Sequence, residues 1–284
     1  MDGASIFIVG AGGQLGQALK QKYPDAQSAD IKEMDITNAQ SVANFDWSKI
    51  KVILNAAAFT NVDGAETTEG RVAAWNVNAS AVANLVRAAA KHDLLLVHIS
   101  SDYVFDGTKS PHTEDELFSP LSVYGQTKAA GDIIASLLPK YYILRTSWVI
   151  GEGRNFVRTM LEVGRKDINP TVVADQVGRL TFTSELVRAI DHLLTSQAAY
   201  GTYNVSNGGD SASWADITRA IYKEAGLDLN VTDTTTVEYY AGKDGIAPRP
   251  LRSELDLSKI QAAGFTPTDW QEDLAKYIAK EAQT

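Results

Sequence analysis

The chain has 284 residues, 44% of them hydrophobic, so it can bury a large core without disulfides or metals to hold it together. Its formal net charge of −9 argues against non-specific binding to nucleic acid, which requires clustered lysine and arginine. It contains no cysteine, which excludes disulfides, thiol nucleophiles and cysteine-ligated metals and fits a reducing compartment. We therefore expect a cytoplasmic protein.

The N-terminal residues run into a short apolar strand and then into a glycine loop. They contain neither a basic segment nor a long apolar stretch, so we expect no signal peptide and no membrane span.

The first half of the chain alternates short β-branched runs with longer helical stretches, as is typical of a parallel sheet covered by helices on both faces. The pattern predicts strands at 5–9, 26–30, 51–55, 94–100 and 141–146, with helices at 14–22, 38–45, 71–92 and 122–138. Right-handed crossovers between them give an α/β fold with a doubly wound, Rossmann-type parallel sheet.

The second half is less regular. A loop is predicted at 151–153, helices at 156–165, 183–195 and 213–225, a short strand at 170–174, and a C-terminal helix that starts at Asp269. We expect residues 1–147 and 172–206 to form a dinucleotide-binding domain. Residues 148–171 and 207–284 would then form a smaller α/β lobe that binds the substrate.

A glycine-rich loop connects the first predicted strand to the first predicted helix. Glycines there allow a tight turn and a close approach of the backbone to a pyrophosphate, while the helix N-terminus faces the phosphates. A plain strand-to-helix turn is the alternative interpretation, but the position within a βαβ frame favours a dinucleotide. The candidate residues are Gly10, Gly12, Gly13, Gln14, Leu15 and Gly16.

The second predicted strand ends at Asp30, about 20 residues beyond the loop, where a carboxylate can bind an adenosine ribose and repel a 2′-phosphate. That favours NADH, but Asp30 could also cap a turn, and the neighbouring Lys32 could attract a phosphate, so NADH and NADPH both remain open. Asp35 and Ile36 could reach the adenine. The small side chains of Ala57 and Ala58 leave room for the cofactor.

Tyr124 and Lys128 open a predicted helix and lie one turn apart on the same face. A nearby cation favours the phenolate and lowers the pKa of a tyrosine. Such a pair is usually an ordinary surface pair, but this one follows a strand that ends near Ser101, at the sheet edge where open α/β sheets bind ligands. The combination indicates a catalytic Ser–Tyr–Lys set.

Together with the glycine loop, these residues resemble the extended short-chain dehydrogenase/reductase family, and within it the group of dTDP-4-dehydrorhamnose reductases. The resemblance covers almost the whole chain. Further motifs that carry it lie at 34–37, 55–63, 102–107, 145–149, 155–156, 175–178 and 249–250.

The resemblance implies that Tyr124 is the proton donor, that Lys128 binds the nicotinamide ribose and lowers the tyrosine pKa, and that Ser101 aligns the substrate carbonyl. It also implies a sugar pocket and a wall along the cofactor. The sugar pocket would be lined by Val62, Asp102, Tyr103 and Trp148, and the cofactor wall by Ala58, Phe59 and Thr60.

The chain departs from the family pattern at three of these positions. The family usually has Thr at Ser101, Pro at Leu180, and His or Tyr at Phe59. The serine keeps the hydroxyl and therefore the role. The other two changes remove no reacting group and bear on the shape of the pocket.

Arg249 lies between two prolines that stiffen its loop, so it is the candidate contact for a substrate diphosphate, with an exposed surface arginine as the alternative. None of the four histidines forms a pair with metal-ligand spacing, so we expect no catalytic metal. Trp75, Trp214 and Trp270 are expected to anchor helices in the core.

The leading hypothesis is an NAD(P)H-dependent reductase acting on the 4-keto group of dTDP-4-dehydro-6-deoxy-L-mannose, with no nucleic-acid or membrane partner. A reductase or epimerase of another nucleotide sugar is a second interpretation. A non-catalytic regulatory subunit resembling the methionine adenosyltransferase β subunit is a third, against which the intact Ser101, Tyr124 and Lys128 argue. A homodimer, and a divalent cation at a dimer contact, are left open.

Overall fold

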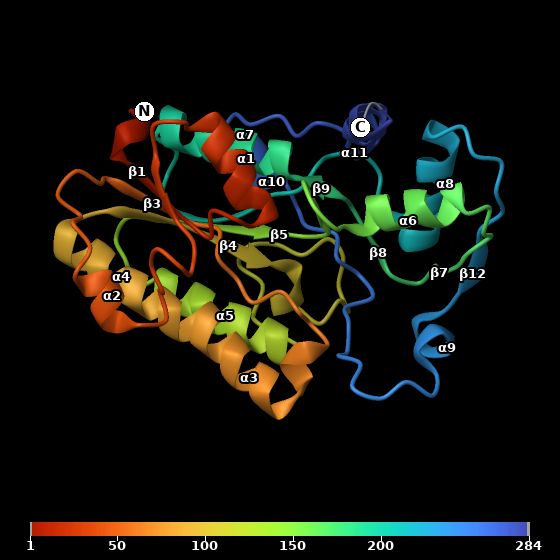
Figure 1. The fold of residues 1–284 in the computed structure, drawn as a ribbon, viewed down its shortest axis with the longest axis horizontal. Coiled ribbons are helices and arrows are strands. Elements are labelled where there is room, and N and C mark those ends of the chain that lie inside the picture. The colour runs from red at the N-terminus through yellow and green to blue at the C-terminus, as the bar shows by residue number, and fades with distance from the viewer. Residues whose placement is uncertain (1, 283–284) are drawn as a thin grey trace.

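Six parallel strands form the central sheet of the chain, which a computed structural model describes over residues 2–282 (Figure 1). Their order across the sheet is β10-β5-β4-β3-β1-β2. The doubly wound parallel sheet predicted from the sequence is confirmed. The strands are β1 (Ile6–Val9), β2 (Gln27–Ala29), β3 (Val52–Asn55), β4 (Leu95–Ser101), β5 (Tyr141–Thr146) and β10 (Gly201–Asn204).

The strand order reverses at β1, which pairs with β2 on one side and with β3 on the other. From β1 the chain moves outward to β2 and then crosses back to β3. Loops that leave neighbouring parallel strands in opposite directions open a crevice at the carboxyl ends of those strands. The glycine loop follows β1 and lies at this point.

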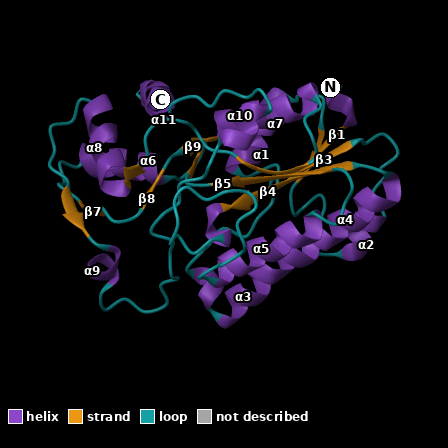
Figure 2. Cartoon of the chain, turned by 180° about the vertical axis from the view of Figure 1, so that it is seen from behind, coloured by secondary structure: helices purple, strands orange, loops and turns teal. Residues whose placement is uncertain are grey.

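Helices cover both faces of the sheet (Figures 1 and 2). On one face lie α1 (Gln14–Lys22), α7 (Thr183–Ser196) and α10 (Ser258–Ala262), and on the other lie α2 (Ala39–Ala43), α3 (Thr68–Trp75), α4 (Ala81–His92) and α5 (Val123–Ala135). Successive side chains of β1 serve opposite faces, as the two-residue period of a strand requires. Ile6 and Ile8 pack with residues of α1 and α7, whereas Phe7 and Val9 pack with residues of α4.

A smaller group of elements lies beyond the carboxyl ends of the strands, on the right in Figure 1. Three two-stranded sheets pair β6 (Val149–Ile150) with β9 (Thr181–Phe182), β7 (Thr171–Val173) with β12 (Thr232–Thr234), and β8 (Val177–Gly178) with β11 (Ala212–Ser213). The helices of this group are α6 (Phe156–Arg165), α8 (Trp214–Glu224), α9 (Thr236–Tyr240) and α11 (Trp270–Glu281). Among residues 2–282, no helix has the length and apolar character needed to cross a bilayer.

Most predicted elements are present, and α1, β5 and α6 have the predicted limits. The prediction missed β10, a strand of four residues with one β-branched residue, Thr202. The helix predicted at 71–92 begins earlier, at Thr68, and a π-helical turn over Asn76–Ser80 separates its two α-helical parts.

We expect Gly16→Ala to destabilise the protein, although alanine is the better helix former. A Cβ at residue 16 would lie 2.0 Å from the Gly10 carbonyl oxygen, so α1 would have to move away from β1. The thermal midpoint should fall by roughly 5 °C. Gly13→Ala is the control, because the nearest atom to its Cβ is 3.4 Å away. Equal midpoints for the two variants would contradict this account.

Candidate active site

The glycine loop brings its backbone close to β3. Gly10 has a φ of +77°, and a Cβ there would lie 2.6 Å from the Ala57 nitrogen, so only glycine fits. Gly13 is the N-cap of α1 and makes no side-chain capping hydrogen bond. The first N–H groups of α1 therefore remain directed at the crevice, an arrangement that suits a pyrophosphate.

A cleft of about 320 Å³ lies at the ends of β1, β2 and β3 and reaches Val77 in the π-helical turn before α4. It is lined by Gly10, Gly13, Asp30, Asp35, Ile36, Ala57 and Ala58, all of them predicted to bind the cofactor. The Asp30 carboxylate leans over the loop, since a Cβ at Gly12 would lie 2.3 Å from its Oδ2 atom. This cleft has the position and lining expected for the adenosine half of a dinucleotide.

A second cleft, of about 440 Å³, continues from the first and shares Gly13, Ala56 and Ala58 with it. It runs along the carboxyl ends of β4 and β5 to the start of α5. Residues predicted to be catalytic, to bind the cofactor and to bind the substrate all line this cleft. They are Gln14, Leu15, Ala58, Thr60, Val62, Ser101, Asp102, Tyr103, Tyr124, Lys128 and Trp148. We call it the catalytic cleft.

Ser101 and Tyr124 are adjacent at the floor of the catalytic cleft. The Ser101 hydroxyl donates to Asp102 Oδ1 at 2.9 Å and accepts from the Tyr103 N–H at 3.2 Å. Burial raises the pKa of Tyr124 to about 12, and a hydrogen bond with Ser101 opposes that rise. The lowered phenol pKa expected from the sequence is therefore not found. At neutral pH the phenol is therefore protonated.

Lys128 lies one turn further along α5 and is buried. Its Nζ atom donates to the Ile99 carbonyl at 2.6 Å, which fixes the side chain against β4. Burial lowers the pKa of Lys128 to about 8, and Asp132 opposes that shift. The ammonium form therefore predominates at pH 7, next to the catalytic cleft.

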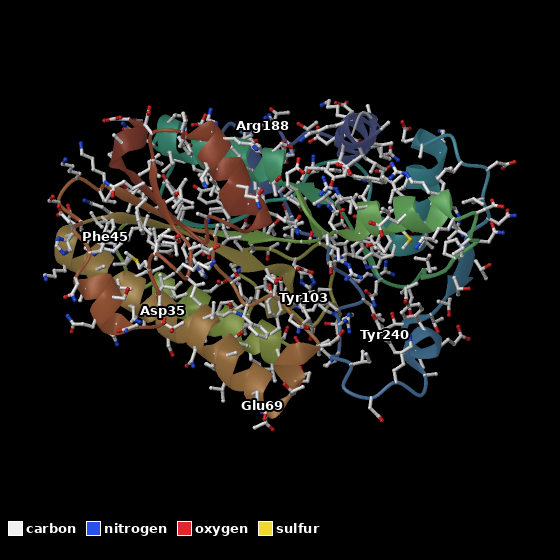
Figure 3. The ribbon with its side chains drawn as sticks, viewed as in Figure 1. Asp35, Phe45, Glu69, Tyr103, Arg188 and Tyr240 are labelled. Atoms are coloured by element: carbon white, nitrogen blue, oxygen red, sulfur yellow. The ribbon has the colours of Figure 1, made fainter. Side chains whose placement is uncertain are left out.

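Asp102 and Tyr103 follow β4 in a 3₁₀ turn capped by Ser101. Burial raises the pKa of Asp102 to about 6, while hydrogen bonds involving Ser253 and Ser101 oppose the rise. The rings of Tyr103 and Tyr124 meet edge to face, with centroids 5.5 Å apart. In Figure 3, Tyr103 lies at the end of the sheet that faces the smaller group of elements.

A third cleft, of about 630 Å³, adjoins the catalytic cleft and shares Tyr103 and Trp148 with it. Its walls are mainly aromatic and aliphatic, and they include Phe156, Met160, Trp214, Tyr239 and Tyr240. Trp148 stacks on Trp214 with ring centroids 3.8 Å apart, although its φ of +47° is unusual for a bulky residue. We call this the aromatic cleft. It suits a planar ring such as a nucleobase.

Arg249 lines the aromatic cleft with a side chain that is 14% exposed, so it is not an ordinary surface arginine. Its Nη2 atom donates to both carboxylate oxygens of Asp63, at 2.8 and 2.9 Å, and its guanidinium lies 4.9 Å from the Tyr240 ring centroid. Burial alone would raise the pKa of Asp63, but hydrogen bonds from Arg249 and Ala247 lower it overall. Tyr240 is labelled near α9 in Figure 3.

Three predicted residues line none of these clefts. Gly12 lies in the loop beside Asp30, Gly16 lies in α1 against the Gly10 carbonyl, and Phe59 packs with Ala65, Ala74, Val123 and Tyr124. The expectations for two tryptophans are corrected, because Trp214 lines the aromatic cleft and Trp75 is 42% exposed. Trp270 is buried as predicted.

Asn78 supports the site and was not found from the sequence. Its side chain accepts from the Phe59 N–H at 2.8 Å and donates to the Phe59 carbonyl and to the Thr127 hydroxyl. It thereby connects the loop after β3 to α5. Its position in a π-helical turn gives it this direction, and periodicity reveals no such turn.

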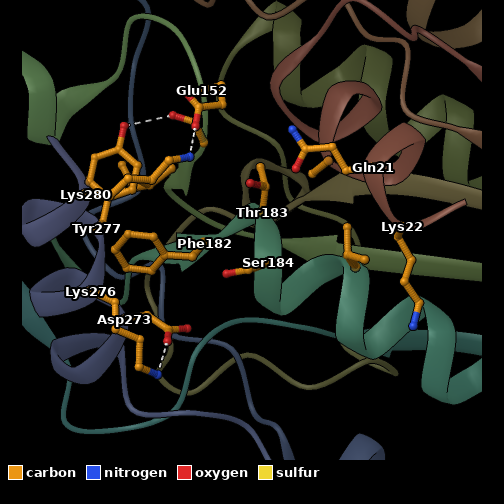
Figure 4. Close-up of a pocket in the computed structure, with 14 residues that line it drawn as sticks. Gln21, Lys22, Glu152, Phe182, Thr183, Ser184, Asp273, Lys276, Tyr277 and Lys280 are labelled. Atoms are coloured by element: carbon orange, nitrogen blue, oxygen red, sulfur yellow. Dashed lines mark hydrogen bonds and ion pairs between the residues drawn. The ribbon is translucent and has the colours of Figure 1, made fainter. Parts of the chain in front are cut away.

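A further cleft, of about 490 Å³, lies between α1, α7 and α11 and contains none of the predicted residues (Figure 4). Ion pairs line it, including Lys276 with Asp273 at 2.9 Å. Within residues 2–282, no group of three or more His, Cys, Asp or Glu side chains is arranged to hold a metal.

The doubly wound sheet, the glycine loop at its switch point and the Ser101–Tyr124–Lys128 set define a protein of the short-chain dehydrogenase/reductase class. More narrowly, the chain belongs to the RmlD substrate binding domain family, whose model matches residues 4–283.

Relatives and solved structures agree with this assignment. The chain is 40% identical to a dTDP-4-dehydrorhamnose reductase of Aggregatibacter actinomycetemcomitans, over 95% of this chain and 97% of that protein. A crystal structure of the Clostridium acetobutylicum dTDP-4-dehydrorhamnose reductase superposes with a TM-score of 0.90 at 36% identity, covering 98% of this chain and 99% of the other. The Bacillus anthracis enzyme in complex with NADP gives 0.88 at 34% identity, covering 97% and 98%.

We expect Asp30→Ala to raise the ratio of kcat/KM with NADPH to that with NADH by roughly 10-fold, because it removes a ribose acceptor and a charge that repels a 2′-phosphate. Steady-state kinetics with both cofactors measures the ratio. Asp35→Ala, in the same cleft, should affect both cofactors alike. An unchanged ratio for Asp30→Ala would show that this residue only caps the turn after β2.

Proposed function

We propose that the protein is an oxidoreductase that reduces the 4-keto group of dTDP-4-dehydro-6-deoxy-L-mannose to give dTDP-L-rhamnose, with NADPH or NADH as reductant. The observation that carries the proposal is that Ser101, Tyr124 and Lys128 line one cleft. This cleft adjoins the cleft proposed for adenosine on one side and the aromatic cleft on the other. The activity named for the relatives is of this kind.

The glycine loop fits a dinucleotide. Side chains at Gly10 or Gly16 would collide with neighbouring backbone atoms, so the backbone stays bare there and a pyrophosphate can approach it closely. A bound reduced nicotinamide would contribute the hydride. Tyr124 then donates its phenolic proton to the oxygen that becomes the alcohol, and the Ser101 hydroxyl orients that oxygen. Lys128 supplies a positive charge that stabilises the phenolate left behind.

The aromatic cleft is proposed to hold the nucleoside and Arg249 the diphosphate, with Val62, Asp102, Tyr103 and Trp148 around the sugar. Tyr103 and Trp148 belong to both clefts, so a ligand that extends from one cleft to the other passes between them. The ordered loop of Arg249 supports its role, because a held guanidinium loses little entropy when it binds an anion.

Two alternatives differ in what they require of the site. A reductase or epimerase of another nucleotide sugar would use the same three residues with a different sugar pocket. A non-catalytic regulatory subunit would not require them. The buried and connected state of Ser101, Tyr124 and Lys128 favours catalysis.

We keep the division into a dinucleotide-binding part (1–147 and 172–206) and a substrate-binding part (148–171 and 207–284) as a proposal. The strand β7 (171–173), which this division splits, pairs with β12 of the second part. The cytoplasm remains the proposed compartment, and a homodimer the proposed assembly.

The reaction is tested by assaying a panel of nucleotide-linked 4-keto sugars through NADH and NADPH oxidation. Turnover of the dTDP-linked 4-keto sugar above the others is expected. Tyr124→Phe should lower kcat by roughly 10²–10⁴-fold, because it removes the proton donor and keeps the ring packing. Near-full activity of this variant, with the fold intact by circular dichroism, would refute the mechanism.

Arg249→Ala should raise KM for the nucleotide sugar by roughly 10-fold, the loss of one charge-assisted contact, and leave cofactor affinity unchanged. Asp63→Asn is the matched control, because it weakens the support of the guanidinium without removing it, and a smaller rise is expected. Titration with dTDP and with cofactor separates the two ligands. Equal losses in both variants would mean that Arg249 only anchors the Asp63 loop.

A further inference from the structure

Three polar residues of α5 recur at intervals of four on the side that packs against the sheet: Tyr124, Lys128 and Asp132. Such spacing places them in one row along the helix. Lys128 and Asp132 are each 1% exposed, and Tyr124 is 9% exposed. The proposed mechanism uses the first two, so the third is a buried carboxyl group without an assigned role.

Asp132 is held by Arg145 of β5. The Arg145 Nε atom donates to Asp132 Oδ2 at 3.0 Å, and its Nη1 atom donates to the Glu114 carbonyl at 2.9 Å. The guanidinium lies 5.2 Å from the Phe105 ring centroid and 5.0 Å from that of Phe118. A buried arginine fixed on several sides keeps its charge, and this stabilises the ionised carboxylate beside it.

The row of α5 residues lies along the three last residues of β4. Lys128 bonds the Ile99 carbonyl, and the hydroxyls of Ser100 and Ser101 oppose the rises in pKa that burial causes at Asp132 and Tyr124. Ser100 is in turn the register partner of Arg145 in β5. The ion pair and the proposed catalytic residues are therefore built on the same short stretch of backbone.

Few charges face Lys128. Asp132 and Tyr124 lie on its own helix, His98 and Asp102 belong to or follow β4, and Arg145 lies on β5. Burial and the lysine charge hold the pKa of His98 well below its ordinary value, so this ring is neutral. Burial raises the pKa of Asp132, but Arg145, Ser100 and Lys128 all oppose that rise. The carboxylate of Asp132 opposes the lowering of the Lys128 pKa that burial causes.

We propose that Asp132, anchored by Arg145, is a positioning residue whose buried negative charge keeps Lys128 protonated where the cofactor ribose and Tyr124 need it. This inference rests on the proposed function. Asp132 acts through Lys128 and does not itself line the catalytic cleft. A purely structural role for the ion pair is the alternative, although buried pairs often add little stability.

Asp132→Asn separates the two roles, because it keeps the shape of the side chain and removes the charge. A lysine with a lower pKa loses its proton at lower pH. The alkaline limb of the pH–kcat profile should therefore move about one pH unit toward acid, with activity at pH 8 reduced roughly 5-fold and much less at pH 6. KM for the nucleotide sugar should stay the same.

A measurement without substrate separates this inference from the proposed reaction. Titration of the Lys128 side chain by ¹³C NMR, assigned with Lys128→Met, should show its pKa reduced by about one unit in Asp132→Asn. In the unsubstituted protein, the Asp132 carboxyl should be ionised from pH 6 to pH 8. A protonated Asp132 in that range would overturn the inference even if the asparagine variant did not fold.

Two variants serve as controls. Asp132→Glu retains the charge and should restore the alkaline limb. Glu185→Gln neutralises another buried carboxylate, which pairs with Arg188 on α7 and accepts from the Thr268 N–H at 2.8 Å. It should lower the thermal midpoint and leave the pH profile in place. If Asp132→Asn also lowers only the midpoint, the ion pair is structural and the inference fails.

Discussion

Parallel strands bring all their carboxyl ends to one edge, and this constraint organises the rest of the molecule. The glycine loop after β1, the small residues after β3 and the Ser101–Tyr103 segment after β4 meet at that edge because the strands run the same way. Helix α5 adds the side chains of Tyr124 and Lys128. Its row of polar residues has to face the sheet, so each of them is buried and must find a partner there.

The partners explain the electrostatics of the site. Lys128 is fixed by a backbone carbonyl and Asp132 by an arginine, and Ser101 opposes the rise in the Tyr124 pKa that burial causes. Burial favours the neutral form of each group, and neighbouring groups oppose the pKa shifts that burial causes. The site therefore holds an acid, a cation and a carboxylate within three turns of one helix, in surroundings from which most water is excluded.

The sequence was informative where periodicity and motif coincide. The alternation of strands and helices predicted the sheet, and the glycine loop and the Tyr124–Lys128 spacing predicted which residues would meet. It was uninformative where the signal is tertiary. The strand β10 joins the sheet through its pairing with β5, the π-helical turn that contains Asn78 has no sequence period, and Trp214 becomes part of a cleft because α8 packs beside Trp148. The pKa of Tyr124 also depends on burial, which the spacing of two residues does not reveal.

Trp148 adopts a left-handed backbone conformation that disfavours side chains with a Cβ. The stacked indole of Trp214 and the shared wall of the two clefts hold it there. The Trp148 side chain therefore has little freedom to change rotamer. A rotation would lose the stacking on Trp214, and the backbone would remain strained. The wall that the catalytic and aromatic clefts share at Trp148 is therefore rigid.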